Sequence, residues 1–144
     1  MIKTKRINTN NQDFIDLVKL LDKELAIRDG DDHTFYHQFN SIVTIKNSII
    51  AYENSIPVGC GAIKEYSPNL IEIKRMFVLP QKRNKGIASK ILIELENWAK
   101  ELSYKKCILE TGKKQHEALQ LYLKAGYEII PNYGQYKNVE NSIC

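Results

Sequence analysis

The sequence has few cysteines and no spacing of cysteine and histidine that is typical of a metal site. Its three cysteines, Cys60, Cys107 and Cys144, are odd in number and far apart in a chain of 144 residues. A disulfide-stabilised secreted domain of this size would carry an even, closely spaced set. We therefore expect reduced thiols, a cytoplasmic protein and no metal.

Long apolar segments are also missing. No apolar run approaches the roughly 20 residues that a membrane-spanning helix needs. The basic residues Lys3, Lys5 and Arg6 are followed by no apolar stretch, so we expect no secretory signal. Repeats, linkers and low-complexity segments are absent as well. With 43% hydrophobic and 26% charged residues, the chain is expected to form one globular domain over residues 1–144, with no membrane partner.

Hydrophobic spacing predicts a mixed α/β fold. Period-two alternation indicates strands and three- to four-residue spacing indicates helices. The expected strands are 3–8, 49–52, 56–64, 71–78, 105–111, 128–130 and 137–144. Four helices are expected. The first follows Asn10 and Asn11, and the second begins near Asp32 and places Phe35, Tyr36 and Phe39 in the core. The third and fourth span about 86–102 and 115–125. In strand 71–78, the alternation places Ile71, Ile73 and Phe77 on one face. Strand 105–111 should pair parallel to it through a right-handed crossover.

Basic residues are concentrated around the turn that joins strand 71–78 to the helix after it. Six basic residues and no acidic one lie between Lys74 and Ile93, while the remaining chain has 15 basic and 17 acidic residues. The turn at 81–86 presents backbone N–H groups at the positive end of a helix, which is a ready anion site. A compact polyphosphate fits this local excess better than nucleic acid, whose binders spread a basic face more widely. A solvated basic helix start is the alternative interpretation.

The turn lacks G-x-x-x-x-G-K-[ST] and G-x-G-x-x-G, which argues against a nucleotide-hydrolysing loop and a dinucleotide-binding fold. It contains Arg83-Asn84-Lys85-Gly86-Ile87-Ala88, which resembles the R/Q-x-x-G-x-G/A motif of the GNAT superfamily of N-acetyltransferases. Residues 118–127 are similar to the same family's A-x-x-L-Y-x-K-x-G-F/Y segment. The order of the expected elements is also similar to the GNAT order.

The resemblance implies a mixed, mostly antiparallel sheet with a central parallel splayed strand pair flanked by helices. It implies acetyl-CoA as co-substrate. The pantetheine arm would bind the end of the central strand, and the pyrophosphate would bind the loop. The residues so implied are Met76, Phe77, Val78, Arg83, Asn84, Lys85, Gly86, Ile87, Ala88, Ser89 and Gln115. Ala88 stands where Gly is commoner, Gln115 stands where Asn is common, and Asn84 replaces a frequent Gly but tolerates a left-handed backbone.

The resemblance also implies two catalytic side chains. Tyr122 would protonate the departing thiolate, and Glu72 would deprotonate the amine directly or through water, with Glu110 and His116 in reserve. For Tyr122 the alternative is core packing, and for Glu72 it is a solvent-facing position on a strand. An idle coenzyme A-binding module would need neither residue, and transfer of another acyl group is a further alternative.

The acceptor is not identified by the sequence. A polyamine, an antibiotic, an amino-acid derivative, a protein N-terminus or a lysine would all supply a primary amine. Asp29, Asp31 and Asp32 form an acidic cluster that could attract a cationic acceptor. A solvated turn with one helix cap is the alternative for this cluster. The expected partners are thus a small-molecule or peptide amine and no nucleic acid, and a homodimer is compatible with the sequence.

Overall fold

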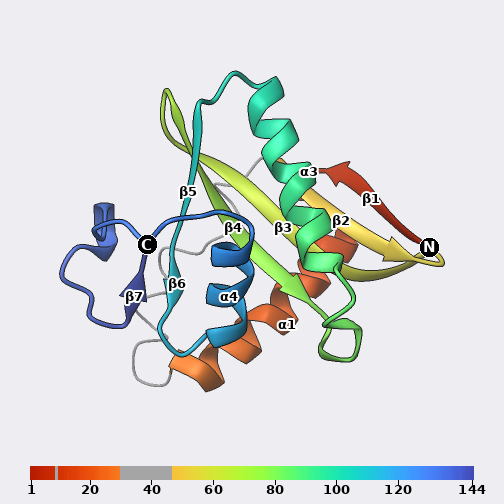
Figure 1. Cartoon of the computed structure of the whole chain (residues 1–144). Helices are drawn as coiled ribbons and strands as arrows, with labels where there is room; N and C mark the ends of the chain where they lie inside the picture. Colours follow the sequence, from red (N-terminus) through yellow and green to blue (C-terminus); the bar gives the residue numbers. More distant parts are fainter. Residues whose placement is uncertain (9, 30–46) are drawn as a thin grey trace.

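A five-stranded sheet forms the centre of the molecule, in the order β1-β2-β3-β4-β5 (Figure 1). The computed structural model describes residues 1–8, 10–29 and 47–144. The strands are β1 (Ile2–Ile7), β2 (Asn47–Glu53), β3 (Ile56–Ser67), β4 (Leu70–Val78) and β5 (Lys106–Leu109). The first three pairings are antiparallel and β4 pairs parallel with β5. The predicted mixed sheet with its central parallel pair is confirmed.

Two long helices cover opposite faces of this sheet. Helix α1 (Gln12–Asp29) packs Phe14 and its neighbours against Ile50 and Phe77, while α3 (Ile87–Glu101) packs Ile91 and its neighbours against the other face. The predicted cap at the start of α1 is present, because Asn11 Oδ1 accepts a hydrogen bond from the Phe14 amide at 3.2 Å. Helix α4 (His116–Lys124) follows β5 along the chain. The helix expected from Asp32, with its three aromatic residues, lies outside the described residues.

Strand β4 contains a β-bulge, which the sequence did not reveal. Cys60 on β3 is opposite Phe77 and Ala62 is opposite Lys74, so Gly61 faces both Arg75 and Met76. Arg75 has a positive φ of 59°. The extra residue reverses the alternation, so Ile73 packs toward α3 whereas Phe77 packs toward α1. The prediction that Ile71, Ile73 and Phe77 share one face is therefore wrong.

Gly61 lets α3 approach the sheet closely, and Gly61→Ala should destabilise the fold. An added Cβ would lie 2.7 Å from Met76 Sδ, 2.8 Å from Leu95 Cδ1 and 2.9 Å from Ile91 Cγ2. Such overpacking of a filled core costs about 1–3 kcal/mol. We expect a loss of this size in the free energy of unfolding, measured by urea denaturation. An unchanged unfolding midpoint would show that α3 shifts away without loss.

The C-terminal part differs most from expectation. Expected strand 105–111 is divided: β5 ends at Leu109, and β6 (Thr111–Gly112) leaves to pair with β7 (Ser142–Ile143). Expected strand 128–130 does not form, although the Ile130 amide donates to the Cys144 carbonyl at 3.0 Å. Expected strand 137–144 shrinks to β7, because residues 137–138 and 140–141 form turns after the 3₁₀ turn η4 (Gly134–Tyr136), and Asn138 is left-handed.

The parallel pair separates at one end. Pairing between β4 and β5 stops at Ile73 and Leu109, while β4 continues to Val78 and the segment after β5 turns away into β6. The two strands thus diverge next to α4 (Figure 1). Within the described ranges, no helix is both long and apolar enough to cross a membrane.

Candidate active site

A cleft of about 570 Å³ occupies the place where β4 and β5 separate. Its walls come from α1, β4, the loop before α3, the first turn of α3, residues 110–112 and α4. The cleft thus brings together almost every expected site residue. Those that line it are Glu72, Met76, Phe77, Val78, Arg83, Asn84, Gly86, Ile87, Ala88, Ser89, Gln115 and Tyr122. Lys85, which was expected beside them, is not among the lining residues.

The start of α3 provides unpaired backbone donors. Asn84 and Gly86 both have left-handed backbone, with φ of 64° and 80°, as the glycine and the Asn-for-Gly replacement in the loop led us to expect. The Lys90 amide is bonded to the Gly86 carbonyl at 3.1 Å, so the amides of the three residues before it precede the first helical bond. No side chain caps them, and nothing lies within 4 Å of the position that a Cβ on Gly86 would take. This arrangement fits a pyrophosphate.

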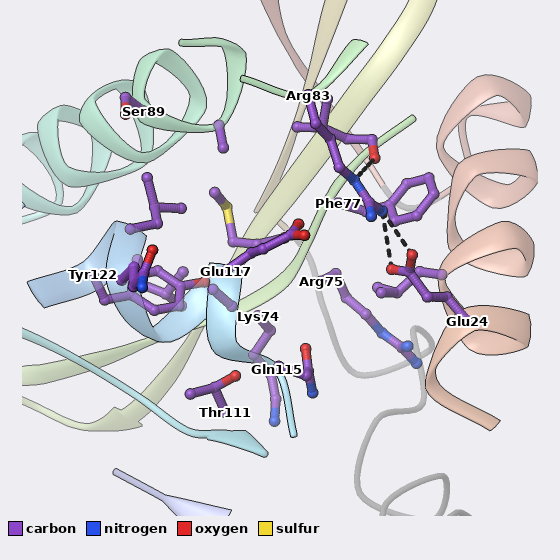
Figure 2. A pocket seen from close by; sticks show the side chains of 18 of the residues that line it. Glu24, Lys74, Arg75, Phe77, Arg83, Ser89, Thr111, Gln115, Glu117 and Tyr122 are labelled. Atoms are coloured by element: carbon purple, nitrogen blue, oxygen red, sulfur yellow. Dashed lines mark hydrogen bonds and ion pairs between the residues drawn. The ribbon is translucent and has the colours of Figure 1, made fainter. Parts of the chain in front are cut away.

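Arg83 links the loop to α1. Its Nε donates to the Val78 carbonyl at 2.9 Å, and its Nη2 donates to the two Glu24 carboxylate oxygens at 2.8 and 3.0 Å (Figure 2). The guanidinium also lies over the Phe77 ring, 5.6 Å from its centroid. In this arrangement the side chain binds protein groups on the α1 side, which leaves backbone N–H groups as the loop's donors for an anion.

Tyr122 is buried in the wall that α4 contributes (Figure 2). Its ring packs edge-on against Tyr127, with 5.8 Å between the ring centroids. Burial, and secondly the negative charge of Glu110, raise the pKa of the Tyr122 hydroxyl above its usual value. The phenol is therefore neutral and protonated at ordinary pH, so it can donate a proton or a hydrogen bond.

Glu72 is buried, with 5% of its surface exposed. Its carboxylate accepts a hydrogen bond from the Tyr133 hydroxyl at 2.7 Å and pairs with Lys74 Nζ at 3.4 Å. Lys74 in turn donates to the Tyr136 hydroxyl at 3.4 Å, and burial lowers the pKa of its ammonium group. The alternative of a solvent-facing Glu72 is wrong.

The two reserve bases are placed differently. Glu110 lines the cleft and accepts a hydrogen bond from Ser142 Oγ at 2.6 Å. His116 is exposed at the start of α4 and is not among the lining residues. Asp31, Asp32 and the side chain of Asp29 lie outside the described residues, so the role of this acidic cluster stays a proposal.

Sequence reasoning missed four functional candidates in the cleft wall: Glu24, Lys74, Arg75 and Tyr136. In the sequence, Lys74 and Arg75 stand out only as members of the basic segment between Lys74 and Ile93. No local sequence pattern connects Glu24 or Tyr136 with this segment. Within the described part of the chain, no three His, Cys, Asp or Glu side chains lie close enough together to hold a metal ion.

The profile of the Acetyltransferase (GNAT) family matches residues 14–127, and the chain belongs to this family. It is 34% identical over 85 residues to the uncharacterised N-acetyltransferase YjgM of Escherichia coli, covering 57% of this chain and 50% of that protein. It is 34% identical over 89 residues to the IAA acetyltransferase of Azospirillum brasilense, covering 61% and 58%. The chain therefore spans about half the length of the curated relatives that it matches.

Solved structures share the fold over nearly the whole chain. A Klebsiella pneumoniae protein assigned as an acyl-CoA N-acyltransferase superimposes with a TM-score of 0.83 at 27% identity, over 99% of this chain and 94% of that one. A GNAT family acetyltransferase from Elizabethkingia anophelis with acetyl-CoA bound has a TM-score of 0.68 at 21% identity, over 99% and 94%. At this identity the second likeness concerns the fold alone.

Proposed function

We propose that the protein is an acetyl-CoA-dependent N-acetyltransferase that acetylates a primary amine. One observation carries the proposal: a single cleft contains an uncapped helix start suited to a pyrophosphate, a buried neutral phenol and a buried carboxylate. The names of the relatives support it, since YjgM is called an N-acetyltransferase and the Elizabethkingia structure holds acetyl-CoA.

The loop and the end of β4 would hold the coenzyme. The amides of Ile87, Ala88 and Ser89 would bind the pyrophosphate, and the backbone of β4 at Met76–Val78 would lie along the pantetheine arm. Acetyl-CoA, when bound, supplies an activated acetyl group as a thioester. The bulge leaves Arg75 and Met76 without residues in register on either neighbouring strand. Of the backbone N–H groups at Met76 and Phe77, the one at Met76 is thus our candidate donor for the oxygen that gains negative charge, because Phe77 stays in register with Cys60.

Two side chains would move protons. Glu72 would take a proton from the acceptor ammonium, directly or through a water molecule, because only the neutral amine attacks a thioester. Tyr122 would give its proton to the leaving sulfur. Lys74 would compete with the acceptor for Glu72, since it already pairs with that carboxylate.

A screen of primary amines with acetyl-CoA, measured as release of free thiol, tests the proposed function. At least one amine should accelerate thiol release well above the rate without acceptor, and Gly86→Glu should abolish the acceleration. Propionyl-CoA in a parallel screen separates acetyl transfer from transfer of a longer acyl group. Tight binding of acetyl-CoA with no acceleration by any amine would instead indicate an idle coenzyme-binding module.

Glu72→Gln should lower kcat/KM for the best amine about tenfold at neutral pH. This is below the usual effect of general base catalysis because water can substitute for the carboxylate. Glutamine keeps the size of the side chain and one acceptor oxygen but cannot take the proton. Coenzyme affinity, measured by calorimetry, should not change. Glu110→Gln is the matched control in the same cleft. Full turnover of Glu72→Gln across the pH range would remove Glu72 from the mechanism.

A further inference from the structure

Arg75 places a buried, incompletely bonded guanidinium in the wall of the cleft. Its side chain is 4% exposed, and Nη1 donates to Asp22 Oδ1 at 2.8 Å. Nε is buried with no hydrogen-bond partner. A guanidinium has five N–H donors, and in the described structure Asp22 is the one side chain that binds this group. Burying a cation with a donor left unsatisfied is costly unless another acceptor completes the set.

The backbone at Arg75 is strained at the same place. Its φ of 59° is rare for a residue other than glycine, and it sits at the bulge of β4. Backbone strain of this kind gathers at ligand sites, where it aims a side chain. Here the side chain is directed toward α1, away from Ser89 and the start of α3 (Figure 2). Arg75 is therefore poorly placed for the coenzyme phosphates and better placed for a second ligand bound in the part of the cleft next to α1.

Charges in and beside the cleft wall occur as pairs of opposite sign. The pairs are Lys74 with Glu72 at 3.4 Å, Arg75 with Asp22 at 2.8 Å, and Arg83 with Glu24 at 2.8 Å. A polyamine could pair with the carboxylates but would offer no acceptor to the unbonded Nε of Arg75. A molecule that has one ammonium and one carboxylate would find a complementary partner for each charge, because Glu72 accepts the ammonium and the arginine fork binds a carboxylate.

We infer that the acceptor is an amine that also carries a carboxylate, and that Arg75 binds this carboxylate. The inference rests on the proposed function and narrows its substrate class. The ammonium lies toward Glu72 and the carboxylate completes the donors of Arg75 left over by Asp22. An ion pair that merely ties β4 to α1 would not discriminate between acceptors, so selectivity separates the two roles.

The experiment compares matched acceptors, which are lysine with cadaverine and phenylalanine with phenethylamine. In the wild type, kcat/KM should favour the carboxylate-bearing member of a pair at least about tenfold. One charge-assisted hydrogen bond is strong enough to produce a preference of this size. Arg75→Gln should abolish this preference through the KM of the amino acid, with the simple amine changed less than about twofold. Arg75→Lys should keep part of it, and Asp22→Asn should keep all of it. Thermal melting identifies any variant that fails to fold, in which case Arg75→Lys decides.

Several results would overturn the inference. Equal or better use of the simple amines by the wild type would do so, as would equal losses for both members of a pair in Arg75→Gln. Preference for phosphoethanolamine over every carboxylate would assign the site to phosphate instead. If acetyl-CoA binds but no amine is acetylated, the proposed function fails, and calorimetry of lysine and phenylalanine with the coenzyme A-saturated protein decides the inference alone. Binding that is lost in Arg75→Gln supports it, and no binding overturns it.

Discussion

Gly86→Glu should raise the Kd for coenzyme A at least about hundredfold while the protein still folds, a shift of about 2.7 kcal/mol in binding free energy. Gly86 has a φ of 80° and open space where its Cβ would be. The new side chain would therefore fit the empty protein but would occupy the approach to the α3 amides. It would also set a carboxylate against the phosphates, where backbone donors now favour an anion. Calorimetric titration with coenzyme A measures the change.

Gly126→Glu is the matched control for this variant. Gly126 also has a left-handed backbone, with φ of 100°, and also has nothing within 4 Å of an added Cβ, but it does not line the cleft. Both variants should lose about 1–2 kcal/mol of folding stability through the same backbone strain. Only Gly86→Glu should lose coenzyme affinity. If the two variants bind coenzyme A equally well, Gly86 is a helix-start glycine and the pyrophosphate lies elsewhere.

The loop and α3 could be predicted from the sequence because their signals are local. The helical spacing of Ile87, Ile91 and Leu95 covers about two turns, and the left-handed Asn84 is a residue type that tolerates this conformation. The bulge at Arg75 could not be predicted in this way. Period-two alternation does not indicate where one extra residue is inserted, and arginine is not a residue type that predicts a positive φ. The error on the face of Phe77 follows from that single residue.

The surroundings of Glu72 were unpredictable for a different reason. Its partner Tyr133 is 61 residues away in the sequence, and the Tyr136 hydroxyl that binds Lys74 is 62 residues away. Both tyrosines come from the C-terminal segment, where two of the expected strands were wrong or too long. The ion pair of Arg83 with Glu24 spans 59 residues in the same way. Single side chains that meet across such distances leave no periodic signal, so the sequence could not indicate these partners.

Tyr122→Phe should lower kcat about ten- to a thousandfold, extending below the usual range for acid catalysis because water can replace the phenol. The substitution removes one oxygen and keeps the ring that packs against Tyr127. No hydrogen bond of the Tyr122 hydroxyl is recorded in the described structure, so little folding stability should be lost. Coenzyme affinity by calorimetry should also change little. Single-turnover measurement with the best amine separates the transfer step from product release.

The pH dependence follows from the surroundings of the Tyr122 hydroxyl. Burial and the nearby Glu110 charge raise the pKa of this group, so it stays protonated through the usual range of a free tyrosine. The wild type should therefore show no loss of activity around pH 10 that is due to this residue.

Tyr127→Phe is the matched control for Tyr122→Phe. It removes a hydroxyl bonded to Glu96 at 2.7 Å and outside the cleft, and should cost about 1 kcal/mol of stability without affecting turnover. Normal turnover of Tyr122→Phe with a good acceptor would make Tyr122 a packing residue, and water or another group would then protonate the sulfur.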